Sequence, residues 1–451
     1  MQMKLPAGAE WILRKLEQNG YEAYLVGGCV RDSLLGTAPH DWDIATIAKP
    51  QEILHCFSDV RTIDAGIRHG TVGIVSQDGL YEVTTFRTDG EYTNHRHPKQ
   101  VRFVNNLFED LSRRDFTINA MAFHPARGLI DPFGGRRDLE NRHIRCVGEA
   151  RARYEEDALR ILRALRFASV LDFNLGEETA SQAKSCRKLL SFIAQERIYS
   201  EFIRMLCGQG VRKILQAFPE ILCVFLPEFT ATYGFCQHSP YHIYDVWEHT
   251  LKVVEGVSPQ PALRLAALFH DAAKPQCFTL DNKQRGHFYG HPQRSAVLAR
   301  QALERLRVDG KTIREVSRLV EAHEMEIVPK ESSVRRALSN MGTEQMFWEL
   351  LELQRADAQA KAPKARQEQE ERIVQVKAIA RKVIEEKQCF SRQMLAVNGT
   401  DIKRLGIEGK RIGKALSFLL EKVIEGTLTN HRVDLLRAVE KWSSESKNNC
   451  R

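Results

Sequence analysis

Apolar residues recur with two different periods along the chain, and the change comes near residue 148. An amphipathic stretch at residues 8–18 predicts a helix that Asn19-Gly20 ends. Short runs rich in β-branched and aromatic residues predict strands, and they lie at 24–26, 72–75, 81–86 and 101–104. After residue 148 the spacing is helical. The pattern predicts an α+β fold with a mixed sheet first and an all-helical remainder.

Two glycines and two aspartates follow the first strand. Gly27-Gly28 ends the apolar run, and Asp41-x-Asp43 comes about a dozen residues later. Glycines there let the backbone approach a phosphate, and a helix start offers free N–H groups. In a strand, Asp41 and Asp43 point to the same side, where they can hold divalent cations. Solvated acids beside a turn are the plainer interpretation, but the combination favours a metal-dependent phosphate site.

Two arginine-rich segments come next. Arg113-Arg114, before Asp115 and Asn119, predicts a helix start that reaches phosphate or ribose, because a guanidinium donates two bonds at once. A surface ion-pair cluster is the alternative. Residues 156–167 predict one amphipathic helix. Three cations and one acid share its polar side, which favours an anionic ligand over a solvated face; they are Asp157, Arg160, Arg163 and Arg166.

Histidines and aspartates gather in the C-terminal half. An apolar helix over 265–275 carries His270-Asp271, with His249 about 20 residues upstream and Asp357 further on. Imidazole with carboxylate suits transition metals or Mg²⁺, although a lone buried histidine is usually structural. Further histidines in this region are His287, His291 and His323. Residues 359–386 are highly charged and predict a solvated helix or a linker.

Composition narrows the class of protein. The 451 residues are 43% hydrophobic and 27% charged, with a net charge of +8, which mildly favours a polyanionic partner. No apolar run reaches the roughly 20 residues that span a bilayer, and the N-terminus does not read as a signal peptide. The ten cysteines form no Cys-x-x-Cys pair, so we expect a reduced, cytoplasmic protein. Residues 394–443 predict a basic helical tail, whose candidate phosphate contacts are Lys403, Arg404, Lys410, Arg411 and Lys414.

The motifs together resemble those of class II tRNA nucleotidyltransferases, the CCA-adding enzyme family that includes bacterial poly(A) polymerases. They run in the family's order through about the first 205 residues: Gly27-Gly28-x-Val30-Arg31-Asp32, Asp41-x-Asp43, Arg113-Arg114-Asp115-Phe116-Thr117-Ile118-Asn119-Ala120, Asp131-Pro132-Phe133-Gly134-Gly135, Glu156-Asp157-x-x-Arg160-x-x-Arg163 and Glu196-Arg197. Residues 238–360 resemble the HD metal-dependent phosphohydrolase domain. The resemblance implies a nucleotidyltransferase head (1–148), a base-recognising neck (149–225), an HD-type body (226–385) and a tRNA-binding tail (386–451).

The resemblance also implies residue roles. Asp41 and Asp43 would be catalytic and bind two Mg²⁺ ions, Gly28 and Arg31 would contact the triphosphate, and Arg114 would reach phosphate or sugar. Arg163 and Arg166 would complete the nucleotide pocket, and Glu82 and Asp110 are candidates for a third carboxylate. In the body, a second divalent metal would be held by His249, His270, Asp271 and Asp357, with His291 and His323 as further candidates.

Base choice follows from hydrogen-bond chemistry. C and A each present an exocyclic amine beside an unprotonated ring nitrogen, whereas U and G present a carbonyl beside a ring N–H. Asp157 accepts and Arg160 donates, so this pair matches C and A and mismatches U and G. A site that leaves buried polar groups unpaired discriminates by roughly 10⁴-fold. The family resemblance assigns the same role to this pair.

The implied function is addition of C and A from CTP and ATP to the tRNA 3′ end without a nucleic-acid template, by a monomer or homodimer. A-adding, CC-adding and poly(A) activities are alternatives within the family. The polar stretch 89–100 reads as a mobile loop and resembles the flexible loop of complete CCA enzymes, but Asn94 stands where many members have an acid. Two other classes remain: a phosphohydrolase working mainly through the HD region, and a non-catalytic RNA-binding scaffold, which the Asp-x-Asp motif disfavours.

Overall fold

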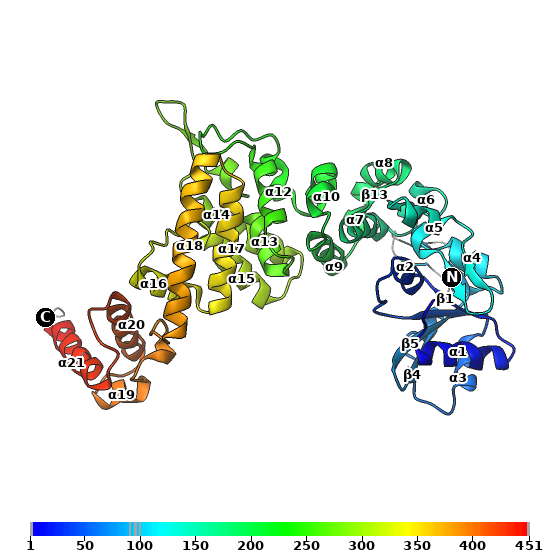
Figure 1. The fold of residues 1–451 in the computed structure, drawn as a ribbon, viewed down its shortest axis with the longest axis horizontal. Helices are drawn as coiled ribbons and strands as arrows, with labels where there is room; N and C mark the ends of the chain where they lie inside the picture. The colour runs from blue at the N-terminus through cyan, green and yellow to red at the C-terminus, as the bar shows by residue number, and fades with distance from the viewer. Residues whose placement is uncertain (1–2, 90–91, 94–96, 99–100, 449–451) are drawn as a thin grey trace. The chain divides into compact units, whose positions relative to one another are not determined.

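A computed structural model describes residues 3–89, 92–93, 97–98 and 101–448. The chain forms two compact units, Met1–Pro227 and Glu228–Arg451 (Figure 1). The expected α+β class is confirmed, because the first unit carries one mixed sheet and both units are otherwise largely helical. The finer boundaries at 148/149 and 385/386 stay predictions.

The sheet of the first unit has seven strands. Their order is β11 (Gly128–Ile130), β10 (Ala122–His124), β1 (Ala23–Val26), β2 (Asp43–Thr46), β5 (Gly79–Thr85), β4 (Thr71–Ser76) and β3 (Thr62–Ile63). Only the β2–β5 pair is parallel within this sheet. The parallel pairing sets Asp43 beside Glu82 in register, so their side chains leave the same face.

Apolar clusters cover the sheet. Helix α1 (Ala7–Gln18) buries Ile12, Leu13 and Leu16, and α3 (Pro50–Cys56) lies beside it (Figure 1). A separate cluster contains Tyr24 and Val26 of β1 together with Leu111 and Ala120. Because this cluster includes residues on both sides of Arg113-Arg114, it anchors the arginine-rich segment to the sheet.

The other elements of the first unit connect the sheet to a helical region. They are α2 (Gly28–Leu34), α4 (Leu107–Ser112), the 3₁₀ turn Thr117–Asn119, α5 (Gly135–Glu140), α6 (Ala150–Glu156), α7 (Leu159–Leu171), α8 (Glu177–Ser185), the 3₁₀ segment Arg187–Phe192, α9 (Gln195–Leu206), α10 (Val211–Ala217) and α11 (Pro219–Phe225). Arg113 caps the end of α4, so the expected helix start at Arg113-Arg114 is wrong. A two-residue parallel pair, β12 (His143–Ile144) with β13 (Asn174–Leu175), links the sheet-bearing part to the helices.

Only parts of the predicted loop 89–100 are described. Before it, β6 (Arg87–Asp89) pairs with β9 (Val101–Phe103). Within it, β7 (Tyr92–Thr93) pairs with β8 (His97–Pro98). Residues 94–96, which include Asn94, lie outside the described residues, so the expectation about a C-to-A switch there stays untested.

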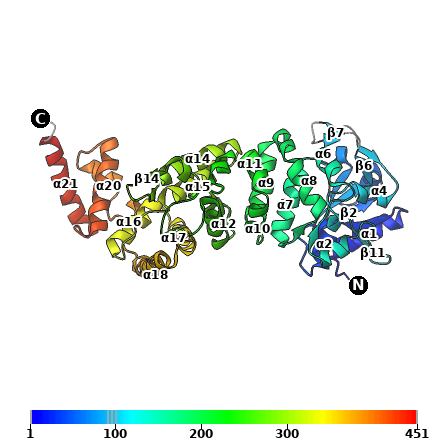
Figure 2. The same cartoon turned by 90° about the horizontal axis from the view of Figure 1, so that it is seen from above.

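The second unit is a helical bundle followed by a smaller helical cluster. Its elements are the 3₁₀ segment Pro227–Thr232, which begins at the unit boundary, then α12 (Val246–Gly256), α13 (Pro261–Phe269), β14 (Thr279–Leu280), β15 (Gly286–His287), α14 (His291–Arg305), α15 (Gly310–Ala322), α16 (Glu331–Met341), α17 (Glu344–Gln359) and α18 (Pro363–Glu385) (Figure 2). The charged stretch 359–386 is therefore helical, and α18 packs against α16 and α17 through Ile373, Val376, Ala380 and Val383. No helix among the described residues has the length and hydropathy to cross a membrane.

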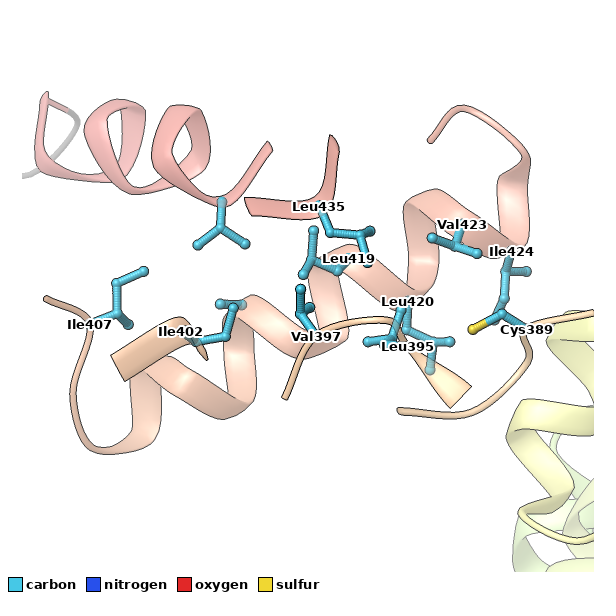
Figure 3. Packing of buried hydrophobic residues seen from close by; sticks show 12 residues of the cluster. Cys389, Leu395, Val397, Ile402, Ile407, Leu419, Leu420, Val423, Ile424 and Leu435 are labelled. Atoms are coloured by element: carbon cyan, nitrogen blue, oxygen red, sulfur yellow. The ribbon is translucent and has the colours of Figure 1, made fainter. Parts of the chain in front are cut away.

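The tail has its own small core. Helices α19 (Gly399–Arg404), α20 (Lys410–Glu425) and α21 (Arg432–Asn448) surround Ile402, Leu419 and Leu435, which are 0% exposed (Figure 3). Asn398 caps α19 by accepting from the backbone of Thr400 and Asp401. The tail is thus the helical element that the sequence predicts.

Candidate active site and metal-ligand cluster

A cavity of about 390 Å³ opens in the first unit. Glycines at the start of α2, the first residue of β2, the segment after α4, and α7 with α9 all contribute to it. Its lining is Gly27, Gly28, Arg31, Asp43, Arg113, Arg114, Asp115, Asn119, Asp157, Leu159, Arg160, Arg163, Phe167 and Arg197. The cavity thus brings together motifs that lie more than a hundred residues apart in the sequence.

Gly27 and Gly28, called the glycine corner below, leave room beside the carboxylate of Asp43. Gly27 has a φ of 75°, a left-handed conformation that favours glycine. A Cβ on Gly27 would lie 3.0 Å from Arg114 Nη1 and 3.9 Å from Asp43 Oδ2. Any side chain here would therefore fill the space between the guanidinium of Arg114 and the carboxylate of Asp43.

Carboxylates crowd at the end of the parallel strand pair. Burial raises the pKa of Asp43, and repulsion from Glu82 and Asp41 raises it further, while Arg114 opposes them. Asp41 precedes β2 and its side chain is 83% exposed, so the expectation that both aspartates share a strand is wrong. Asp41 nevertheless lies close enough to act on Asp43. A buried carboxylate with two further acids near it suits a divalent cation.

Asp110 orients the two arginines. Its carboxylate is 1% exposed and lies 2.8 Å from Arg113 Nη2 and 3.1 Å from Arg114 Nη2. Burial raises its pKa, but the two arginines outweigh burial and lower it. Of the two candidate third carboxylates, Glu82 therefore adjoins Asp43, whereas Asp110 is engaged by guanidinium groups.

Arg31 reaches across the cavity from α2. Its Nη1 donates to Asn119 Oδ1 at 2.7 Å, and its Nε donates to Asp32 at 2.8 Å. The guanidinium carbon lies 5.0 Å from the centre of the Phe167 ring. These contacts hold Arg31 against both the arginine-rich segment and α7.

The expected single helix over 156–167 is wrong. Helix α6 ends at Glu156, Asp157 is extended with φ −132° and ψ 103°, and α7 begins at Leu159. Asp157 Oδ1 accepts from the Leu159 backbone at 3.0 Å, and Oδ2 lies 3.4 Å from Arg197 Nη2. Because Asp157 stands at a helix junction, its carboxylate faces the cavity rather than continuing a helical stripe.

The arginines of α7 have distinct partners. Arg160 is 8% exposed and donates to Glu156 at 2.5 Å and to the Arg113 carbonyl at 3.0 Å. Arg166 lies 3.1 Å from Glu201, and burial lowers its pKa to about 10. Arg160 therefore lines the cavity, whereas Arg166 faces Glu201.

Arg163 joins α7 to the arginine-rich segment. Its Nε and Nη2 donate to Asp115 Oδ2 at 2.8 and 2.6 Å. Burial raises the pKa of Asp115, but Arg163 and the Asn119 amide outweigh burial and hold it at about 2. The ion pair fixes the neck helix to the segment that carries Arg114.

Sequence reasoning missed several lining residues as candidates. Arg197, Asn119 and Phe167 belong to stretches that were recognised, but no ligand role was assigned to them. Arg197 Nη1 is buried and has no hydrogen-bond partner among the described residues. The Glu196-Arg197 motif, which contains this residue, was the sequence feature that could have indicated a role at the cavity.

The second unit brings six predicted metal ligands into one buried cluster. His249 Nε2 lies 3.0 Å from Asp357 Oδ1 and 3.5 Å from Asp271 Oδ2. His270 Nε2 lies 3.2 Å from Asp271 Oδ2. His291 and His323 approach the other oxygen of Asp271, at 3.1 and 3.8 Å. His287 is outside this cluster and pairs with Asp281.

Each clustered imidazole faces the aspartates with Nε2. The Nδ1 atoms contact backbone carbonyls: His249 with Ala360 (3.3 Å), His270 with Ala267 (2.8 Å), His291 with Phe288 (2.9 Å) and His323 with Val320 (2.7 Å). A carbonyl only accepts, so Nδ1 carries the proton and Nε2 is available to a metal. Burial lowers the pKa of His323 to about 3, which keeps this ring neutral.

Two lysines flank the cluster. Lys274 Nζ lies 2.8 Å from Asp271 Oδ2, and Lys361 Nζ lies 2.6 Å from Asp357 Oδ2. Burial raises the pKa of Asp271, but His270 and Lys274 outweigh it and keep that pKa well below its usual range. Both aspartates are therefore held as anions, the form that binds a cation.

The basic residues predicted for the tail lie on α19 and α20. Lys403 and Arg404 end α19, and Lys410 begins α20. Lys403, Arg404, Lys410 and Lys414 are exposed, and Arg411 is half-buried near the Trp442 ring. Their positions are compatible with phosphate contacts and with ordinary surface charge.

Asp115→Asn tests the ion pair with Arg163. A pKa of about 2 in the fold against 3.8 for the unfolded group contributes about 2 kcal/mol of stability. Because the folded pKa is depressed, this contribution is present above pH 4 and is lost as pH falls toward 2. We expect hydrogen exchange of α7 to quicken at pH 7 and the difference from the parent to shrink below pH 4. Asp172→Asn, at an exposed pair with Arg142, is the control and should change little. If the faster exchange of α7 in Asp115→Asn did not vary with pH, the stabilising role assigned to the Asp115–Arg163 ion pair would be wrong.

Comparisons with known proteins cover most of the chain in three parts. Residues 23–145 match the family model of the poly A polymerase head domain. Residues 172–231 match a probable RNA- and SrmB-binding site of polymerase A, and residues 293–439 match a putative domain 2 of tRNA nucleotidyltransferase.

Curated relatives match mainly the N-terminal half. The CCA-adding enzyme of Geobacillus thermodenitrificans is 49% identical over 217 residues, which are 48% of this chain and 53% of that protein. The CCA-adding enzyme of Oceanobacillus iheyensis is 52% identical over 205 residues, 46% of this chain and 51% of that protein. The chain thus spans about half the length of the curated relatives it matches.

Solved structures match over nearly the whole chain. The Bacillus stearothermophilus CCA-adding enzyme in complex with CTP has a TM-score of 0.73 and 29% identity, and 98% of each chain is covered. The Thermotoga maritima CCA-adding enzyme complexed with tRNA has a TM-score of 0.58 at 20% identity, covering 97% of this chain and 96% of that one, which shows a shared fold. The family models, the relatives and the fold together show that parts of this chain are similar to tRNA nucleotidyltransferases and poly(A) polymerases, the family that its motifs resemble.

Proposed function

We propose that this chain is a tRNA nucleotidyltransferase that adds C and A from CTP and ATP to the tRNA 3′ end. One observation carries the proposal: a single cavity joins Asp43 and the glycine corner to Asp157 and Arg160. Asp43 and the glycine corner suit metal-dependent phosphoryl transfer, and Asp157 with Arg160 suits recognition of a base. The relatives named as CCA-adding enzymes support the same activity.

The head residues would handle the triphosphate. Two Mg²⁺ ions held by Asp41 and Asp43 would supply activation of the RNA 3′-hydroxyl and charge neutralisation at the leaving pyrophosphate. Gly28 offers its backbone, and Arg31 and Arg114 offer guanidinium groups to phosphate oxygens. Asp110 keeps Arg114 aimed at the cavity. The chemistry then depends on positioning and charge, with no nucleic-acid template.

Base choice would rest on Asp157 with Arg160. Asp157 accepts from the exocyclic amine of C or A, and Arg160 donates to the unprotonated ring nitrogen. Arg160 is held by Glu156 and the Arg113 carbonyl, which limits its freedom to adapt to U or G. The tRNA would meet the helical body and the basic tail through its backbone and shape. We place this reaction in the cytoplasm.

The first experiment supplies tRNA that ends at its discriminator base with CTP alone, ATP alone, or both. We expect addition of two C residues with CTP and a complete CCA end with both nucleotides, read as product lengths on a sequencing gel. Addition of A alone or long A tracts would replace the proposal with an A-adding or poly(A) enzyme. Asp41→Ala and Asp43→Ala should each abolish incorporation of both nucleotides, and Asp172→Asn should retain the parental rate. Normal rates in both alanine variants would reject the head site.

Asp157→Ala tests the base reader. Without the carboxylate, the amine of C or A loses its acceptor, so we expect selectivity against UTP and GTP to fall from roughly 10⁴-fold to near tenfold. Metal dependence should be retained, because Asp43 is unchanged. The measurement is the kcat/KM ratio for CTP over UTP and for ATP over GTP. A variant as selective as the parent would show that another group reads the base.

A second activity is favoured by the cluster in the body. We propose that His249, His270, Asp271 and Asp357 hold a divalent metal and make this region an HD-type phosphohydrolase. Two buried aspartates, with imidazoles whose Nε2 atoms point toward them and whose Nδ1 atoms contact backbone carbonyls, are a donor set that fits a metal. A metal there would supply a Lewis acid and an activated water, while Lys274 and Lys361 keep the aspartates ionised.

The hydrolase proposal is tested with the full chain and bis(p-nitrophenyl) phosphate in the presence of Mn²⁺ or Ni²⁺. We expect metal-dependent release of p-nitrophenol, at least a hundredfold weaker in His249→Ala and in His270→Ala. His287→Ala removes a neighbouring histidine outside the cluster and should keep the activity. Asp43→Ala should also keep it, since the head is a separate site. Loss of hydrolysis in Asp43→Ala, with the histidine variants active, would assign the reaction to the head. No hydrolysis with any metal would mean that the body only carries RNA.

A further inference from the structure

The aromatic ring of Phe167 lies among arginines. Phe167 belongs to α7, lines the cavity of the first unit and is 8% exposed. The guanidinium carbons of Arg166, Arg31 and Arg163 lie over its ring, at 4.1, 5.0 and 5.6 Å from the ring centre. Side chains of like charge therefore gather around one aromatic residue at the wall of the candidate active site.

Guanidinium groups held this closely repel one another. Burial lowers the pKa of Arg166 to about 10, Glu201 opposes burial, and repulsion from Arg163 adds to the lowering. The face of an aromatic ring carries partial negative charge and attracts a cation that lies within about 6 Å of its centre. The Phe167 ring thus offsets part of the repulsion among the arginines that it contacts.

Arg31 depends on the ring more than the arginines of α7 do. Its carboxylate partner is the adjacent Asp32, which lies on the same short helix, α2. Its Nη1 donates to the neutral amide oxygen of Asn119 at 2.7 Å. The arginines of α7 instead form ion pairs with acids of other segments, Asp115 and Glu201. The ring is therefore the contact through which α7 holds Arg31.

The guanidinium of Arg31 lies over the glycine corner. Its Nη2 is 3.7 Å from the position that a Cβ on Gly28 would take. The backbone at the start of α2 and the guanidinium thus face the same part of the cavity, and both offer donors that suit phosphate oxygens. A small displacement of Arg31 would separate these two sets of donors.

We propose that Phe167 is a positioning residue for nucleotide binding: its ring face holds Arg31 against α7, so that the guanidinium stays directed at the triphosphate. The inference rests on the proposed function, which assigns Arg31 to the phosphates. Phe167 itself has no hydrogen-bond donor for a phosphate, so it acts through the arginine. Because Arg31 belongs to α2 and Phe167 to α7, the ring couples the side of the glycine corner to the side of Asp157.

The experiment replaces Phe167 in the full chain with phenylalanine analogues that carry increasing numbers of ring fluorines. Fluorine withdraws charge from the ring face and changes the size of the ring little, so packing is kept while cation–π attraction weakens in steps. The measurement is the affinity for CTP and for cytidine with Mg²⁺ and without tRNA, by titration calorimetry. We expect CTP affinity to fall with each fluorine, to about tenfold in total, and cytidine affinity to stay within about twofold, because cytidine carries no phosphate.

Ordinary substitutions test whether the ring acts through Arg31. Phe167→Leu should weaken CTP binding about tenfold in the parent but less than about twofold in Arg31→Ala, where the partner of the ring is already gone. Phe167→Tyr keeps an aromatic face and should retain the parental affinity.

Phe116→Leu is the matched control. The Phe116 ring is 0% exposed and packs edge-on against Phe167, with 5.7 Å between ring centres. Among the described residues, the cation–π contacts of the arginines are made with Phe167 and not with Phe116. We therefore expect Phe116→Leu to lower the midpoint of thermal unfolding and to leave CTP affinity within about twofold of the parent.

The outcomes distinguish this inference from the proposed function. If Arg31→Ala binds CTP as tightly as the parent, the triphosphate site of the proposed function is wrong, and the role of Phe167 is rejected with it. If Arg31→Ala weakens CTP binding but the fluorine series is flat, the ring only packs, and this inference alone is overturned. Equal losses of CTP and cytidine affinity would also overturn it, because the ring would then shape the base pocket.

Discussion

The ion pair between the buried Asp115 and the half-buried Arg163 is the contact on which the arrangement of the candidate active site depends. It joins the segment that carries Arg114 to the helix that carries Arg160. Arg163 Nη2 and Nε both donate to Asp115 Oδ2, at 2.6 and 2.8 Å. The Asp115 carboxylate is buried, so its charge would be costly there without the guanidinium of Arg163, whose side chain is 34% exposed. Because Asp115 lies beside the sheet and Arg163 on α7, this pair holds the side of Asp43 and the side of Asp157 around one cavity.

Both candidate sites are places where charge is concentrated and incompletely balanced. At the head, burial and then repulsion from Glu82 raise the pKa of Asp43, so a divalent cation would stabilise a carboxylate that Arg114 only partly compensates. In the body, Nε2 atoms converge on Asp271 while their Nδ1 atoms are occupied by carbonyls. Compensated groups, such as Asp110 with its two arginines, instead orient other residues. The contrast between balanced and unbalanced charge separates positioning residues from ligand-binding ones.

Local patterns predicted most elements but not their interruptions. The strands at β1, β4 and β5 and the helix at α1 follow from periodicity, which is a property of neighbouring residues. The helix break at Asp157 did not follow, because residues on both sides favour helix and the kink is stabilised by distant partners such as Arg197. The sequence also predicted a helix start at Arg113-Arg114, which instead lies at the end of α4, because neighbouring residues alone do not fix such a boundary. Charge composition predicted a solvated helix or a linker at 359–386; the segment is helical, but α18 also buries an apolar stripe that this composition did not indicate.

The sequence by itself determined the types of chemistry: glycines beside acids, arginines near the carboxylate of Asp157, and histidines with aspartates. Residue types set which hydrogen bonds and metals are possible, and this does not depend on the fold. Only the tertiary structure decided which groups meet. It placed Glu82 against Asp43 through strand register, directed Arg166 to Glu201, and split the oxygens of Asp271 between two histidine pairs. Such choices depend on contacts between segments far apart in the chain, where each buried charge must find its partner.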